Sequence, residues 1–177
     1  SKNREKRLTH TGRLKRTASK RGEDMCLEEA KAKKLEPIKQ CLKMYTNYQI
    51  ESINDGFIIV FPYRYWLDGD GMSIVLLLED DMDTLILQDD DFCIHNSICL
   101  IPEERNNVLA IAKKCRLDCF YESDERATPE FRAKISPLSF CLNSNIERLI
   151  DKIEEFLNKL IVFNWKAYEE MDGAANT

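Results

Sequence analysis

The C-terminal part of the chain has the pattern that constrains the fold most. Ser144-Asn145-Ile146-Glu147 is a capping box, in which a serine and a glutamate three residues later satisfy free backbone N–H groups at a helix start. Apolar residues follow at helical spacing: Ile146, Leu149, Ile150, Ile153, Phe156, Leu157, Leu160 and Phe163. The pattern predicts an amphipathic helix of about 20 residues or more, fraying near Trp165 and Tyr168, whose apolar face must be covered by a sheet.

Three upstream segments are typical of β-strands. Residues 56–61 are apolar on both faces and stop at Pro62, which predicts a central strand. Residues 72–78 and 84–88 flank the acidic loop 79–83, which predicts a β-hairpin with a five-residue tip. We expect these three strands to form the nucleus of the sheet.

The other apolar patterns complete the predicted fold. Helical spacing over residues 27–45 is interrupted by Pro37, which predicts either a kink or a second helix that begins at Pro37. The remaining predicted elements are a helix over 102–115 and strands over 117–121 and 133–141, around the polar loop 122–130. The sequence thus predicts an α+β fold: a small mixed or antiparallel sheet with a central hairpin, packed against a long C-terminal helix and two shorter helices.

Charge is segregated along this chain of 177 residues, whose formal net charge is −5. Residues 1–24 hold nine Lys and Arg residues against three acidic ones, with too few apolar residues to bury a helix face. From Tyr65 through Glu104 there are eleven acidic residues and no Lys or Arg. We expect a basic flexible arm over 1–24, a single α+β domain over 25–172 and a short tail over 173–177.

The cysteines and the hydropathy pattern predict a cytoplasmic protein. The seven cysteines are scattered, and Cys93, Cys99 and Cys141 lie inside apolar runs, which is typical of reduced and mostly buried thiols. No apolar run reaches the roughly 18 residues that a membrane-spanning helix needs, and the N-terminal residues do not resemble a secretory signal.

Several short motifs occur in a family-like order. Asp55-Gly56 opens the first predicted strand, which ends in Phe61-Pro62-Tyr63, and Gly69-Asp70-Gly71 precedes the hairpin. The hairpin ends in Leu87-Gln88-Asp89-Asp90-Asp91-Phe92, and Glu104-Arg105 opens a helix. Over about residues 35–165 this order resembles the bacterial and phage family called domain of unknown function 1828. Asp91 stands where that family usually has glycine, and Tyr63 replaces its usual phenylalanine. The resemblance implies an α+β fold and a phage or mobile-element setting, and it implies no established activity.

Enzyme hypotheses find little support in the sequence. A metal-dependent nuclease is the sharpest of them, because Asp68, Asp70 and Asp89–Asp91 can meet at strand ends and hold a cation. That region has no lysine to complete a nuclease arrangement, so we interpret these carboxylates as solvated turn residues. Asp68-Gly-Asp-Gly71 lacks the later ligands of a calcium loop and is interpreted as a turn.

Cysteine and histidine offer two further candidate sites. Cys93, His95 and Cys99 are candidate zinc ligands, and Cys93 with His95 would share one side of a strand as a catalytic dyad. Both patterns are more often packing, and no Gly-rich phosphate loop is present. We therefore predict a protein without catalytic residues, bound metal or cofactor.

The basic arm gives the first functional prediction, which is nucleic-acid binding. Lysine and arginine neutralise phosphates, while the interspersed threonine and serine hydroxyls donate hydrogen bonds to them. The candidate residues are Lys2, Arg4, Lys6, Arg7, Arg13, Lys15, Arg16, Lys20 and Arg21. The sequence thus favours a non-enzymatic accessory protein of a phage or mobile element; the competing interpretation of the arm is a solvated tail.

The acidic middle of the chain gives the alternative prediction. A surface of carboxylates can imitate a phosphate backbone and occupy a basic groove of a host nucleic-acid enzyme, with aromatic residues as anchors. The candidate partner-binding residues are Tyr63, Tyr65, Trp66, Asp68, Asp70, Glu79, Asp80, Asp81, Asp83, Asp89 and Asp90. In this interpretation the carboxylates of the hairpin loop are dispensable for stability.

Overall fold

A six-stranded antiparallel sheet forms the centre of the molecule. The structure is a computed structural model that describes residues 18–123, 128–136, 138 and 145–175. The strands are β1 (Gln49–Ile53), β2 (Gly56–Tyr65), β3 (Gly71–Leu78), β4 (Leu85–Asp89), β5 (Asp118–Tyr121) and β6 (Pro129–Ile135). They lie in the order β1-β2-β3-β4-β6-β5, so the predicted α+β fold and its β2-β3-β4 nucleus are confirmed.

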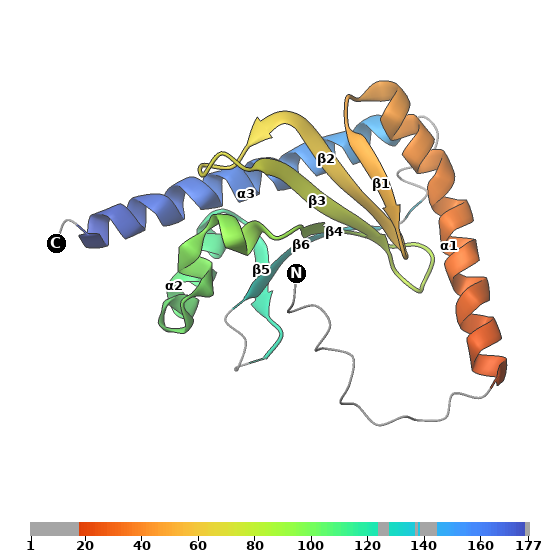
Figure 1. Ribbon diagram of the computed structural model, residues 1–177, viewed down its shortest axis with the longest axis horizontal. Coiled ribbons are helices and arrows are strands. Elements are labelled where there is room, and N and C mark those ends of the chain that lie inside the picture. Colours follow the sequence, from red (N-terminus) through yellow and green to blue (C-terminus); the bar gives the residue numbers. More distant parts are fainter. Residues whose placement is uncertain (1–17, 124–127, 137, 139–144, 176–177) are drawn as a thin grey trace.

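Helices α1 (Ala18–Tyr45), α2 (Arg105–Lys114) and α3 (Ile146–Ala175) pack around this sheet (Figure 1). Helix α3 lies across one face, while α1 contacts β1 and β2 and α2 contacts β5. Short 3-10 helices η2 (Phe92–His95), η3 (Ser97–Leu100) and η4 (Pro102–Glu104) join β4 to α2. The predicted C-terminal helix is confirmed, although Ser144 of its capping box lies outside the described residues. None of the described helices is long and apolar enough to cross a membrane.

The core lies between α3 and the facing side of the sheet. Alternate strand residues such as Ile59, Ile74 and Leu76 are fully buried there, because successive side chains of a strand point to opposite faces. The apolar positions of α3 that the sequence pattern selects, among them Leu149, Ile153, Leu157 and Leu160, are buried in the same core. The side of α3 predicted to be apolar is therefore the side that packs.

Helix α1 differs from its prediction in two ways. It runs without interruption through Pro37, so the alternative of a second helix beginning there is wrong. It also begins at Ala18, inside the segment predicted as a flexible arm, and with 28 residues it is nearly as long as α3 rather than one of two shorter helices. Burial of Leu35, Ile38 and Leu42 against the sheet explains why the helix continues past the proline.

Strand β1 is absent from the sequence-based prediction. It pairs with β2 through a tight turn at Asn54 and Asp55, where Asp55 has a φ of 65°. Gly56 follows because a Cβ at this position would lie 1.8 Å from the carbonyl oxygen of Leu76 on the neighbouring strand. The Asp55-Gly56 motif thus has two structural reasons, the left-handed turn and the close approach of β3.

Strand β2 continues past Pro62, which the sequence predicts as its end. The pairing of β2 with β3 is irregular between Val60 and Tyr65, and Tyr63 has a φ of 63°. Proline is tolerated in a sheet at such a bulge, because no ladder hydrogen bond depends on its missing N–H. The bulge carries the chain onward to Tyr65 and so places the loop that follows, residues 66–70.

Strand β6 is also displaced from its prediction. It spans Pro129–Ile135 rather than 133–141, so it begins inside the predicted polar loop; residues 137 and 139–141 lie outside the described part of the chain. Phe131 and Ile135 face the core, and the alternating residues Glu130, Arg132 and Lys134 face away from it. This alternation places three charged side chains on one face of an interior strand.

Candidate functional site

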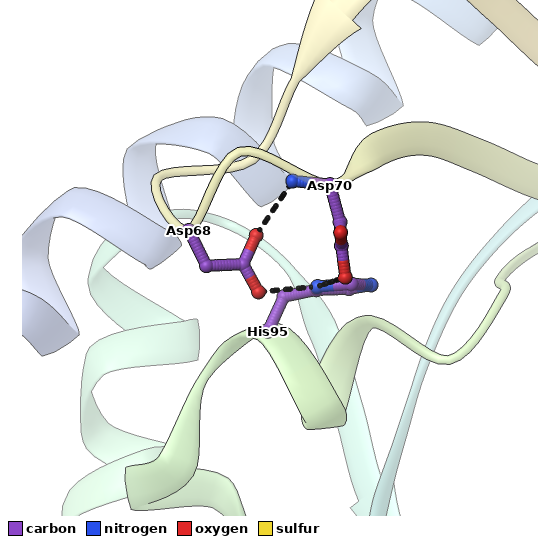
Figure 2. Close-up of side chains that lie close together, drawn as sticks. All are labelled: Asp68, Asp70 and His95. Atoms are coloured by element: carbon purple, nitrogen blue, oxygen red, sulfur yellow. Dashed lines mark hydrogen bonds and ion pairs between the residues drawn. The ribbon is translucent and has the colours of Figure 1, made fainter.

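The β2–β3 loop and the end of η2 bring two aspartates and a histidine together, although 27 residues separate Asp68 from His95. The Nδ1 atom of His95 lies 2.7 Å from Asp68 Oδ2 and 3.6 Å from Asp70 Oδ2 (Figure 2). We call these three residues the His–Asp cluster. The backbone N–H of Asp70, followed by His95, holds the pKa of the Asp68 carboxyl below its usual range.

The loop that carries the two aspartates is closed by its own hydrogen bonds. Trp66 N donates to Asp70 O at 2.8 Å, and Gly69 N donates to Trp66 O at 2.9 Å. Gly69 has a φ of 91°, a left-handed conformation that glycine adopts without strain. Asp70 N also donates to Asp68 Oδ1 at 3.0 Å, which leaves Asp68 Oδ2 for His95.

His95 is held in place from two sides. Its ring stacks on the buried Trp66 ring, with centroids 6.0 Å apart, and its side chain is 8% exposed. The buried Asn164 of α3 accepts from Leu67 N at 3.3 Å and donates to His95 O at 3.4 Å. Helix α3 therefore fixes both halves of the His–Asp cluster relative to each other.

A hollow of about 320 Å³ opens beside the His–Asp cluster. It is lined by Asp68 and His95 together with Leu67, Ile94, Asn96, Ser97, Asn164 and Tyr168. Asn96 is 4% exposed, and its Nδ2 has no hydrogen-bond acceptor among the described residues. A buried donor without an acceptor is costly, so Asn96 leaves one hydrogen bond unmet beside this hollow.

The acidic β3–β4 loop is bound to its own domain rather than freely solvated. Asp80 lies 2.6 Å from the amine of Lys31 on α1, and Asp83 Oδ1 accepts from Leu138 N at 3.0 Å. Asp81 accepts from the backbone N–H groups of Asp83 and Thr84, both at 2.9 Å. These hydrogen bonds lower the pKa of Asp81. Three of the four carboxylates in the loop therefore have structural partners.

Asp89 and Asp90 also have internal partners. Asp89 Oδ1 accepts from Phe131 N at 2.8 Å, and burial raises the pKa of Asp89 to about 6. Asp90 Oδ2 accepts from the Ser73 hydroxyl at 2.8 Å. Among the described residues, the carboxylates that the nuclease hypothesis groups together are thus divided, since only Asp68 and Asp70 share a candidate metal cluster.

The three aromatic residues predicted as partner anchors lie in different environments. Tyr63 is 88% exposed and Tyr65 is 59% exposed, so both are accessible. Trp66 is 3% exposed and packs on Phe92, with ring centroids 4.9 Å apart. Trp66 is therefore a core residue and cannot serve as a surface anchor, because its ring is already enclosed.

The cysteine sites considered from the sequence have a different arrangement in the structure. Cys93 and His95 lie on the 3-10 helix η2, not on a strand, so residues two apart do not share one side. Cys93 Sγ donates to Pro129 O at 3.3 Å, while His95 contacts Asp68. Cys93 and Cys99 are buried free thiols, as predicted, and Cys141 lies outside the described residues.

A basic groove lies where α2, β6 and α3 meet. It has a volume of about 240 Å³, and its charged lining consists of Arg116, Arg132, Lys134, Lys152 and Lys159 with Asp118 and Glu155. Lys152 and Lys159 lie 3.3 and 3.2 Å from Glu155. The cations outnumber the acids, and the sequence-based prediction missed this groove because its residues come from three separate segments.

Two details of the basic groove bear on anion binding. Arg132 Nη2 lies 2.6 Å from Glu130 and its guanidinium lies 4.8 Å from the centre of the Phe120 ring, but its buried Nε has no acceptor among the described residues. Arg116 has a φ of 56°, at a helix end where glycine is the usual residue. Both features favour a role beyond packing, since each has an energetic cost.

The residues of the predicted basic arm are only partly described. Lys20 and Arg21 lie in α1, and Lys2, Arg4, Lys6, Arg7, Arg13, Lys15 and Arg16 lie outside the described residues. Comparisons with protein-family models, with curated proteins and with solved structures find no match. The resemblance to domain of unknown function 1828 therefore stays a prediction from short motifs.

Proposed function

We propose that this chain is a non-enzymatic nucleic-acid-binding protein whose folded domain contributes the basic groove and whose N-terminal arm adds further phosphate contacts. The observation that supports this most is the set of five Lys and Arg residues that line one groove. The phage or mobile-element setting implied by the family resemblance is part of the same proposal, in which the protein is an accessory factor.

The shape of the basic groove suits an extended anionic strand. Residues Ala133–Ile135 of β6 pair with β4, while β5 pairs with β6 from Arg132 back to Pro129. The last residues of β6 are therefore open on the side that faces the groove. Lysine and arginine on a long α3 and on the α2–β5 turn flank this open edge, which favours contacts to successive phosphates.

The groove has few aromatic side chains for stacking on bases. Phe120 is covered by the Arg132 guanidinium, and Phe156 is a buried core residue. Binding through phosphates without base stacking predicts weak sequence preference and a strong dependence on salt.

The alternative function is an inhibitor that binds a basic partner. Fewer carboxylates are available for that partner than the sequence predicts. Asp80, Asp81, Asp83, Asp89 and Asp90 all have partners within the domain. The exposed Tyr63 and Tyr65 next to the Asp68–Asp70 loop are the residues that favour this alternative. The inhibitor surface would lie at the Tyr65 end of β2, whereas the β3–β4 loop lies at the Gly56 end.

The proposal is tested by fluorescence anisotropy with labelled single-stranded and duplex oligonucleotides, over a series of salt concentrations. The variant Arg116→Gln/Lys134→Gln should weaken binding and lower the slope of log affinity against log salt by about 1.8 for duplex DNA, because each lost phosphate contact contributes about 0.9. The control Lys33→Gln/Lys43→Gln makes the same change of charge on exposed residues of α1, which contacts the far edge of the sheet.

Two results would contradict the proposal. If both double variants lose affinity equally, the interaction follows net charge and the groove has no specific role. If the intact chain does not bind either oligonucleotide at low salt, the nucleic-acid function itself is wrong, and the inhibitor alternative is tested next through Tyr63 and Tyr65.

A further inference from the structure

We propose that Asp68, Asp70 and His95 form a binding site for a divalent metal ion that takes nitrogen and oxygen ligands. Each residue offers one ligand atom, and these atoms all lie within 4.8 Å of one another. The inference is independent of the nucleic-acid function, since the His–Asp cluster and the basic groove share no residues.

The donor set defines the class of ion. One imidazole nitrogen and two carboxylate oxygens suit first-row ions such as Zn²⁺ and Mn²⁺, whereas thiolates are absent from the cluster. The two carboxylates balance the charge of a divalent ion. Among the described residues, the ion-pair partner of both Asp68 and Asp70 is His95. A metal ion would therefore not have to displace a lysine or arginine from these contacts.

The present spacing is close to that of a coordinated set. Metal–ligand bonds of about 2.0–2.2 Å place tetrahedral ligand atoms about 3.3 Å apart. The separations from His95 Nδ1 are 2.7 Å to Asp68 and 3.6 Å to Asp70, which bracket that value. The ion would take the place of the proton between His95 Nδ1 and Asp68, and the ring would keep one proton on Nε2. The Nδ1 proton moves to Nε2 if the ring is neutral, and to solvent if both nitrogens are protonated.

The site is preorganised by the groups around it. Asp70 N holds Asp68 through Oδ1, the Trp66 ring supports the His95 ring, and Asn164 joins the two loops. Supporting contacts of this kind fix ligand orientation and strengthen metal binding. Three protein ligands would leave at least one coordination position open for water or another ligand.

The buried Asn96 gives a second observation at the same place. Asn96 lines the hollow that Asp68 and His95 also line, and its buried Nδ2 has no acceptor among the described residues. The competing explanation is that the His–Asp cluster is an ion pair that only fastens the β2–β3 loop to η2.

Imidazole nitrogen NMR on the full-length chain separates the two explanations. The chain has two histidines, so a ¹⁵N-labelled sample gives two assignable rings, and His10 serves as an internal control. Zinc ion is the probe, because it is diamagnetic. Zinc bound by free thiols such as the exposed Cys26 does not affect the reading, since only imidazole signals are followed.

Titration with Zn²⁺ should shift Nδ1 of His95 in a saturable manner and leave His10 unchanged. Asp70→Asn should weaken this binding by about tenfold or more, because it removes a ligand. The matched control Asp91→Asn, an exposed aspartate outside the cluster whose φ of 56° asparagine also tolerates, should not. The proposal is overturned if His95 does not respond, if it responds through Nε2, or if Asp70→Asn binds as well as Asp91→Asn.

Discussion

Removing the two carboxylates that contact Lys31 is expected to destabilise the fold more than removing Lys31 itself. The Lys31 amine lies 2.6 Å from Asp80 and 3.4 Å from Asp55, and the lysine side chain is 3% exposed. Its partners are 82% and 44% exposed. The buried group of this ion pair is therefore the cation, and its partners can be hydrated without it.

The expected free energies follow from this asymmetry. Asp55→Asn/Asp80→Asn leaves a buried amine without a countercharge, which costs about 3–5 kcal/mol in a fully buried pair and about 2–3 kcal/mol here because the lysine stem can turn toward water. Lys31→Met keeps the stem packing and frees two exposed carboxylates, at a cost of about 0.5–1 kcal/mol. Asparagine tolerates the φ of 65° at position 55, so the backbone adds little.

Urea denaturation followed by circular dichroism measures these differences in the full-length chain. The triple variant Lys31→Met/Asp55→Asn/Asp80→Asn should return to within about 1 kcal/mol of Lys31→Met, because the unpaired charge is then gone. If Lys31→Met proves more destabilising than the double aspartate variant, the amine is not the buried member of the pair. If the double variant is as stable as the unchanged chain, Asp55 and Asp80 are freely solvated and have no structural role.

Two further variants test other sites. Burial raises the folded-state pKa of Asp89 to about 6 while its unfolded value is about 3.9, so the folded state binds the proton more tightly and loses stability as pH rises from about 4 to 6. Asp89→Asn keeps the acceptor for Phe131 N and should therefore be more stable than the unchanged chain at pH 7. Its free energy of unfolding should also depend less on pH between about 4 and 6. An unchanged pH dependence would contradict the burial of the charge. Arg116→Gly should raise stability by about 1 kcal/mol by relieving the left-handed φ of 56°, while weakening oligonucleotide binding; loss of stability would mean that the Arg116 side chain packs.

The parts of the fold that the sequence predicts are those whose apolar periodicity is strong. Helix α3 and the β3–β4 hairpin bury residues at regular intervals, so spacing alone locates them. Strand β1 is an edge strand with mostly exposed side chains, and no apolar face distinguishes it from a loop. Strand β6 does alternate, at Phe131, Ala133 and Ile135, but its charged alternate positions make the segment resemble a polar loop.

The candidate sites are less predictable because they join distant segments. His95 is close in sequence to Cys93, yet the 3-10 turn of η2 directs it to Asp68, whose position depends on the bulge at Tyr63. The basic groove escapes detection for a related reason. Its Lys and Arg residues come from three separate segments that also hold acidic residues such as Asp118 and Glu155, so no single segment reveals the groove.

A net charge of −5 does not oppose the proposed binding of a polyanion, because the acidic side chains are locally compensated. Asp80 faces Lys31, and Asp89 lies within the domain against Phe131 N. Charges farther apart than about 8 Å are largely screened at physiological salt, so a bound strand senses mainly the residues that line its groove. The acidic loop does influence one end of that groove, since Lys134 is near enough to lower the pKa of Asp81. An anionic strand would therefore be held less tightly at the Lys134 end than at the α2 end, where Lys113 and Lys114 occupy the last turn before Arg116.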